Sequence, residues 1–251
     1  MKKIIIIVAI FVLSMSQAFA KYGFRSMTLG GATGIIVTPD ARVPFSNADT
    51  SVDTGVHYLQ DGESIIPKVT VGLFKRWEIG GAFDLQGTNS NDVLLHSKLR
   101  FSPWASGNSS SALAIGGNYQ NLNNGGVSTT SYQVYLAATY AGTFFGNPAE
   151  TTVTIGSTEF TSAVDFGMGF DVNFMPQYLK GFVHWVTDFS NFSYSRQAQG
   201  ANVNRAMFNT GVRIAVLHSH SRLKLNVDLL GLDLLDTNRS FSAGLNFGMS
   251  I

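Results

Sequence analysis

Apolar and polar side chains alternate along most of this chain. In the last eleven residues, FSAGLNFGMSI, Phe241, Leu245 and Ile251 fall on one face of an extended strand, while small or polar residues fall on the other. This follows because successive side chains of a strand point to opposite sides. The same alternation recurs at 163–174 and at 220–230, where Asp, Asn, Gly, Lys and Arg stand opposite Phe, Leu and Val.

The pattern predicts about twelve strands. Most are close to the ~9 to 11 residues that a tilted strand needs to cross a membrane. They cover 49–60, 64–74, 76–86, 91–102, 110–121, 130–141, 150–157, 163–174, 178–189, 205–217, 220–230 and 238–251.

Short and long links between these strands tend to alternate, as they do when one rim of a membrane barrel has turns and the other has loops. The tight links are 75–76, 175–177 and 218–219, and the long polar links are 122–129 and 190–204. Two links break the alternation: 61–63 is short and 142–149 is long.

The first twenty residues, MKKIIIIVAIFVLSMSQAFA, have the organisation of a secretory signal peptide. A basic start precedes an apolar run, and Ala18 and Ala20 form the small-residue pattern that signal peptidase reads. The apolar run from Ile4 to Leu13 is shorter than the ~20 residues of a membrane-spanning helix. We therefore expect residues 1–20 to be removed after export, and the mature chain to start at Lys21.

The composition suits a membrane barrel. Charged residues make up only 13% of the chain, there are 26 glycines, and there is no cysteine for a disulfide. Hydrocarbon cannot satisfy backbone N–H and C=O groups, so strands in a membrane must close on themselves. The prediction is all-β: a single closed antiparallel transmembrane β-barrel of about 12 strands over 49–251, in a Gram-negative outer membrane. A secreted β-sandwich is the alternative, because its strands also alternate.

The expected direction of the chain indicates that the N-terminal part of the mature protein is not a strand of the barrel wall. An exported barrel starts and ends on the periplasmic side, which requires an even number of strands. A thirteenth strand at 29–39 would break this parity. Residues 21–48 are therefore expected inside the lumen mouth or on the periplasmic rim.

The polar face of the strands is predicted to line the lumen. Its charged members are Lys68, Glu78, Asp84, Lys98, Arg100, Asp165, Asp171, Arg213, Arg222, Lys224 and Asp228. Together with Asp53, Lys180 and Asp188 they balance in sign, which favours cross-lumen ion pairs over strong ion selectivity. Twelve strands lie between the packed interior of eight and the aqueous channel of sixteen, so the sequence predicts a narrow or plugged passage.

One short stretch resembles a known family. GATGIIVTPDARV at 31–43 is similar to the Gly-Leu-Ile-x-Thr-Pro-x-Ala-Arg motif near the mature N-terminus of YjbH-like outer-membrane proteins. The matching residues are Gly34, Ile35, Ile36, Thr38, Pro39, Ala41 and Arg42. The resemblance spans about a dozen residues and implies an outer-membrane barrel associated with exopolysaccharide production or export.

Two interpretations of this motif follow from its residues. Pro39 fixes a bend, and Arg42 has the reach to pair with a carboxylate in the lumen. The segment is then either a functional plug or a tight turn at the start of the barrel.

No catalytic, metal or cofactor site is predicted. The His pair of HSHSR, 218–222, straddles a tight turn and has no third ligand. His96 and His184 face the predicted lumen, and no serine lies at a spacing that would suggest a catalytic Ser–His pair. GGATG lacks the lysine and following helix of a phosphate-binding loop.

The functional hypothesis is therefore a non-enzymatic barrel that passes small or extended polar solutes, a polysaccharide among them. A structural or surface-interaction barrel acting through 122–129 and 190–204 is the first alternative, and a lipid-modifying barrel enzyme is the second. The expected partners are outer-membrane lipid, the barrel-assembly machinery and the solute. The near-zero net charge of +1 argues against nucleic acid. Ile251 departs from the aromatic residue that usually ends such chains.

Overall fold

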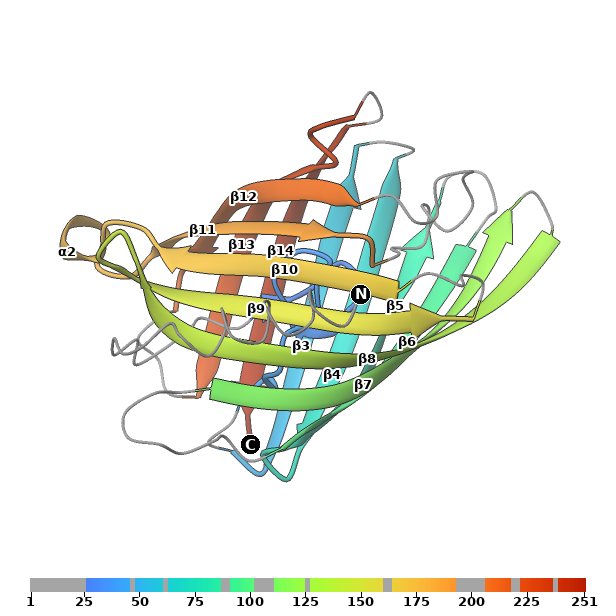
Figure 1. Ribbon diagram of the computed structural model, residues 1–251, viewed down its shortest axis with the longest axis horizontal. Coiled ribbons are helices and arrows are strands. Elements are labelled where there is room, and N and C mark those ends of the chain that lie inside the picture. Colours follow the sequence, from blue (N-terminus) through green and yellow to red (C-terminus); the bar gives the residue numbers. More distant parts are fainter. Residues whose placement is uncertain are drawn as a thin grey trace, which may run out of the picture.

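The computed structural model describes residues 26–45, 48–60, 63–86, 91–101, 111–124, 127–159, 164–192, 206–217, 222–236 and 239–251. Twelve antiparallel strands, β3 to β14, pair in chain order, and β14 pairs with β3 to close the barrel (Figure 1). The predicted fold class is confirmed. Among the described residues, no helix has the length and apolarity to cross a membrane.

The barrel strands are β3 (Thr50–Leu59), β4 (Ser64–Leu73), β5 (Trp77–Leu85), β6 (Asn91–Arg100), β7 (Ser111–Asn124), β8 (Val127–Phe144), β9 (Asn147–Thr158), β10 (Val164–Asn173), β11 (Val183–Ser190), β12 (Met207–Ala215), β13 (Leu223–Leu232) and β14 (Ser240–Ser250). We call the end where β3 starts and β14 finishes the terminal rim, and the opposite end the loop rim. Two short strands, β1 (Ser26–Met27) and β2 (Thr33–Gly34), and one helix, α2 (Pro176–Leu179), complete the described elements.

Every predicted strand overlaps an observed one, and the differences concern the links. The long link expected at 122–129 is mostly strand, because β7 runs to Asn124 and β8 begins at Val127. The link expected at 142–149 shrinks to a turn at Phe145 and Gly146, both with positive φ. Residues 193–204 of the link expected at 190–204, and both residues of the link expected at 218–219, lie outside the described residues.

The strand predicted at 178–189 begins later than expected. Met175 has a φ of 46° and Lys180 a φ of 49°, so the backbone is left-handed at both ends of α2. Such residues end a strand, and β11 starts only at Val183. The tight link predicted at 175–177 is therefore wrong: the chain turns over a longer stretch that contains α2.

The alternation of the sequence is realised as an apolar outside and a polar inside. On β14, Phe241 is 58% exposed, whereas Ser242 and Asn246 are 4% and 2% exposed. Leu136 on β8 is 60% exposed. This reverses the arrangement of a soluble protein, and it matches a wall whose outer face is solvated by lipid.

Polar groups on the outer face are satisfied within that face. The indole N–H of Trp77 donates to Ser97 Oγ at 2.9 Å, and that of Trp185 donates to Thr210 Oγ1 at 2.8 Å. Because hydrocarbon offers no hydrogen-bond acceptor, these pairs let both indoles remain in an apolar surrounding.

Residues 26–45 lie inside the barrel, and we call this segment the plug (Figure 1, blue). β1 and β2 pair as a small hairpin, with Gly31 at a φ of 96° between them. The apolar plug residues Leu29, Ile35 and Ile36 pack against wall residues. Those wall residues are Leu59, Ile66, Ala82, Leu94, Val186, Leu230 and Leu232. A second apolar cluster joins Ala41 of the plug to Ala114, Tyr135 and Ala137 of the wall. Apolar contacts therefore join the plug to an inner wall that is largely polar.

Candidate functional site

The strongest attachment of the plug is to one wall carboxylate. Asp188 on β11 accepts backbone N–H groups from Ile36 at 3.2 Å, Val37 at 2.8 Å and Thr38 at 3.0 Å, all at the same oxygen. Its other oxygen accepts the Asn209 side-chain amide at 2.8 Å. Three successive backbone N–H groups form a concave anion site, and Asp188 fills it from the wall.

Cationic wall side chains bind carbonyl groups of the plug. Lys68 Nζ donates to Thr28 O at 2.6 Å, and Lys98 Nζ donates to Thr33 O at 2.9 Å. Arg213 Nη2 donates to Ile35 O at 2.8 Å. Because the acceptors are main-chain oxygens, these contacts depend on the path of the plug more than on its side chains.

Neutral and acidic wall groups add to the main-chain contacts. Thr70 Oγ1 donates to Gly31 O and Thr154 Oγ1 donates to Pro39 O, both at 2.7 Å. Thr33 N–H donates to Glu78 Oε1 at 2.9 Å, and Ala41 N–H donates to Thr139 Oγ1 at 2.8 Å. The wall thus binds the plug from β4, β5, β6, β8, β9, β11 and β12 at once.

Side chains of the plug also make ion pairs with the wall, and Asp40 Oδ1 lies 3.5 Å from Lys98 Nζ on β6. Arg42 Nη2 lies 2.5 Å from Glu150 Oε1 on β9, and both side chains are only 7% exposed. This is the carboxylate within reach that the sequence suggested for Arg42. The other motif residues shape the plug: a Cβ on Gly34 would overlap the Thr38 carbonyl, and Gly34 forms an isolated bridge with Pro39.

The predicted lumen residues fall into three groups. Nine are buried on the inner face: Lys68, Glu78, Asp84, Lys98, Asp165, Asp171, Arg213, Lys224 and Asp228. Arg100 is half-buried at the end of β6, and Arg222 is exposed at a bend before β13. Arg222 is therefore not one of the buried inner-face residues, because it precedes β13.

On the described strands, the buried charges are not evenly balanced. Lys180, counted as inward, is exposed in the turn after α2. Asp92 and Glu150 were missed, although Asp92 shares the strand parity of His96 and Lys98. Among the described residues, nine carboxylates are buried on the barrel strands against four cationic side chains. The carboxylates are Asp53, Glu78, Asp84, Asp92, Glu150, Asp165, Asp171, Asp188 and Asp228, and the cations are Lys68, Lys98, Arg213 and Lys224.

The charges are also unevenly distributed along the barrel. Asp84, Asp92 and Asp165 each lie one residue from the strand end at the loop rim. The four cations lie in the middle or toward the terminal rim, where they meet acidic residues. Lys98 Nζ is 3.2 Å from Glu78 Oε1, Arg213 Nε is 2.9 Å from Asp228 Oδ1, and Lys224 pairs with Asp53.

Amide side chains surround the carboxylates of the loop rim. Gln86 Nε2 donates to Asp92 Oδ2 at 3.2 Å, and Gln133 Nε2 donates to Asp165 Oδ2 at 2.9 Å. Asp84 and Asp92 lie directly opposite each other across β5 and β6. This end of the lumen is therefore lined by carboxylates and amides.

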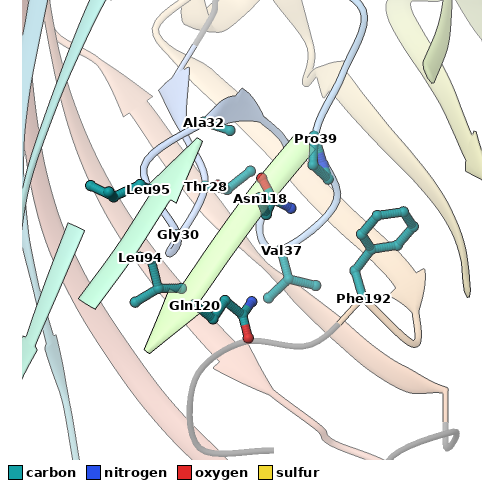
Figure 2. A pocket seen from close by; sticks show the side chains of 10 residues that line it. All are labelled: Thr28, Gly30, Ala32, Val37, Pro39, Leu94, Leu95, Asn118, Gln120 and Phe192. Carbon is teal, nitrogen blue, oxygen red and sulfur yellow. The ribbon is translucent and has the colours of Figure 1, made fainter. Parts of the chain in front are cut away.

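A small cavity lies between the plug and the wall. A cavity of about 30 Å³ lies on the side of the plug that faces β6 and β7 (Figure 2). Thr28 and Val37 of the plug line it together with Leu94, Gln120 and Phe192. A water needs roughly 10–15 Å³ by this kind of measure, so the cavity has room for one or two waters.

The lumen histidines pair with carboxylates. His184 Nδ1 lies 2.6 Å from Asp171 Oδ1, and His96 Nε2 lies 3.5 Å from Glu78 Oε1. Within the described parts of the chain, no three His, Asp or Glu side chains are grouped so as to hold a metal ion. His218 and His220 lie outside the described residues.

Solved structures share the fold. The KdgM porin aligns with a TM-score of 0.52 at 10% identity, over 80% of this chain and 99% of that one. The KdgM porin in complex with disordered oligogalacturonate aligns with a TM-score of 0.50 at 9% identity, over the same share of each chain. The sequence matches no protein-family model and no curated protein. The chain therefore has the fold of outer-membrane porin-type barrels.

Proposed function

We propose that this protein is an outer-membrane passage for small or extended polar solutes, closed at rest by the plug, with no chemical change to the solute. The observation that carries the proposal is the way the plug is held. Charged and hydroxyl groups of the wall bind its main chain, and the cavity between the plug, β6 and β7 is only about 30 Å³. The terminal rim would then be periplasmic, as in exported barrels.

The inner wall leaves room for the plug. A Cβ on Gly169 would lie 2.9 Å from Ile35 Cγ1, and one on Gly167 would lie 2.8 Å from Thr38 Oγ1. Larger wall side chains at these positions could fill the lumen directly, as they do in small barrels. Glycine at both positions supports a wall adapted to a separate segment that can leave.

The groups that bind the plug suit a polyhydroxylated solute. Lysine, arginine and threonine donate to carbonyl oxygens of the plug, and Asp188 and Glu78 accept its N–H groups. Hydroxyl groups are both donors and acceptors, so a sugar chain could replace each of these contacts. The resemblance of residues 31–43 to YjbH-like proteins supports a role linked to polysaccharide.

A reversible tether tests the proposal. The chain has no cysteine, so Ile35→Cys with Gly169→Cys introduces one pair, at a spacing suited to a disulfide. We expect the oxidised protein in planar bilayers to carry no current, and reduction to restore current and uptake of small sugars into liposomes. Each single cysteine variant is the control, with folding checked by heat-modifiability on a gel.

Two results would contradict the proposal. Equal currents before and after reduction would show that the plug does not close the passage. No current from wild type, single variants or the reduced double variant would favour a structural barrel.

One observation favours a surface-interaction role as the second candidate. β7 pairs with β6 only as far as Asn121, and β8 pairs with β9 only from Gln133. Residues 122–124 and 127–132 therefore form a two-stranded ribbon beyond the sheet at the loop rim, visible at the right of Figure 1. If deleting the ribbon tip abolished cell-surface binding to a partner without changing conductance, this second role would be supported.

A further inference from the structure

We propose that the solute of this passage is a short peptide with aliphatic side chains, which binds the inner wall where the plug now lies. This inference rests on the proposed function and narrows its range of polar solutes, because the wall groups become accessible only when the plug moves. The plug is itself a stretch of peptide, so its contacts indicate which parts of a peptide the wall recognises.

The first step is that the wall binds the plug mainly through its main chain. Within the described residues, wall side chains accept hydrogen bonds from five N–H groups of the plug and donate to seven of its carbonyl groups. Every residue except proline carries the same N–H and C=O groups on its main chain. These contacts therefore recognise a polypeptide as such and depend little on its sequence.

The second step is the apolar cluster on the inner wall. Ile35 and Ile36 of the plug pack there against aliphatic wall side chains, among them the buried Leu94 and Val186. Removing such side chains from water is favourable. A sugar chain has hydroxyl groups but no aliphatic side chain, so it would leave this cluster uncovered. A peptide supplies partners both for the polar wall groups and for the apolar cluster.

The third step is that the most tightly held part of the plug is a compact turn. Residues 34–39 have the sequence Gly-Ile-Ile-Val-Thr-Pro, and their two ends form an isolated bridge. Inside this turn, Ile35 N–H donates to Thr38 O at 3.0 Å. The N–H groups of 36–38 are thereby left for Asp188. Because the turn is closed by its own main-chain contacts, a free hexapeptide of this sequence can form it.

Three buried wall side chains from three strands bind this turn. Asp188 on β11 accepts its three N–H groups. Arg213 Nη2 on β12 donates to Ile35 O at 2.8 Å, and Thr154 Oγ1 on β9 donates to Pro39 O at 2.7 Å. Hydrogen bonds to charged groups are stronger than neutral ones, so Asp188 and Arg213 contribute most of the main-chain binding. The ligand that fits this wall is therefore a peptide turn with two aliphatic residues.

The test is competition between the plug and a free peptide in the full-length protein. Ala41 of the plug is fully buried, so a cysteine at this position reacts with maleimide only when the plug leaves the wall. We expect the acetylated and amidated hexapeptide of residues 34–39 to raise the labelling rate of Ala41→Cys several-fold, because it occupies the wall groups to which the plug must return. We also expect liposomes with the wild-type protein to take up this peptide faster than a neutral oligosaccharide of similar size.

Two analogues of the hexapeptide separate main-chain recognition from side-chain recognition. A depsipeptide in which an ester oxygen replaces the Val37 N–H keeps every side chain but loses one hydrogen bond to Asp188, and we expect its half-saturating concentration to rise about tenfold. When Asp188→Asn is added to Ala41→Cys, the peptide and the depsipeptide should differ much less, because the acceptor is then neutral. An analogue with serine in place of both isoleucines keeps the main chain and should also bind more weakly, because it leaves the apolar cluster uncovered.

The outcomes separate this inference from the proposed function. Equal potency of the hexapeptide and both analogues, or faster uptake of the oligosaccharide, would overturn the peptide as the solute and leave the passage intact. An unchanged labelling rate with the hexapeptide would overturn peptide recognition by the wall. Absence of both current and uptake of any solute, in the wild type and in the reduced Ile35→Cys/Gly169→Cys protein, would instead remove the proposed function.

Discussion

The contact of Asp188 with the plug gives the sharpest quantitative prediction. Replacing Asp188 with Asn keeps the size of the side chain and one carbonyl oxygen, but removes the charge that three plug N–H groups share. The new NH₂ would also face the Asn209 NH₂ that now donates to Asp188. The substitution should destabilise the closed state of the plug without creating a cavity in the barrel wall.

The size of the effect follows from the number of bonds. A hydrogen bond to a charged group contributes roughly 1.5–3 kcal/mol net, against about 0.5–1.5 kcal/mol for a neutral one. A loss of about 1 kcal/mol for each of three bonds amounts to about 3 kcal/mol. Since 1.4 kcal/mol is tenfold in an equilibrium constant, the open fraction should rise roughly a hundredfold.

The assay is thiol labelling of the plug. Ala41 is fully buried, so Ala41→Cys provides a single cysteine that a maleimide reaches only when the plug leaves its site. We expect Asp188→Asn to raise the labelling rate of Ala41→Cys in outer-membrane vesicles by about two orders of magnitude, and to raise the open probability in bilayers in parallel.

The matched control is Asp165→Asn. Asp165 is also a buried wall carboxylate, but its hydrogen bonds run to Gln133 and Thr158 of the wall. It should leave the labelling rate within a few-fold of the parent. Equal acceleration by the two substitutions, or none by Asp188→Asn, would refute the assignment of Asp188 as the main attachment of the plug.

Three further predictions follow. Arg42→Glu should remove the cationic partner of buried Glu150 and destabilise the closed state of the plug by about 3–5 kcal/mol. The swap Arg42→Glu with Glu150→Arg should recover part of this free energy, as measured by the labelling assay. If the swap recovers nothing, the ion pair does not stabilise the closed state. Leu136→Arg should lower the free energy of unfolding in liposomes by about 2–4 kcal/mol, whereas Leu235→Arg, 78% exposed in a link, should change it little; equal effects would argue against a lipid-facing β8. Gly244→Ala should lower the urea midpoint by the equivalent of about 1–3 kcal/mol, because its Cβ would overlap the buried His57 ring; an unchanged midpoint would show that His57 can move aside.

The sequence by itself determined the wall. Strand side chains alternate with a period of two whatever they pack against, so the order of Phe241, Ser242 and Leu245 was enough to assign the outer and inner faces of β14. Export and the lack of charge indicated lipid outside, and lipid requires a closed sheet. All twelve strands were found in this way because each step depends on local sequence or on the solvent alone.

The occupant of the lumen was only partly predictable. The parity of the strand count excluded residues 29–39 from the wall, and Arg42 suggested an ion pair in the lumen. Asp188 was recognised as inward, but its donors, Ile36, Val37 and Thr38, are about 150 residues away along the chain. No local pattern links them, because the contact exists only once the ring closes around the plug.

Only the tertiary structure decided the electrical character of the lumen. The alternation of residues assigns each side chain of a strand to the outer or the inner face of the barrel. This assignment holds only for residues that lie within a strand. Lys180 and Arg222 fall just beyond strand ends, and their long side chains extend into water, while Asp92 and Glu150 fall within strands and are buried. A shift of one or two residues in strand boundaries therefore changes which charges are buried on the described strands, because burial depends on where each strand begins and ends as well as on sequence parity.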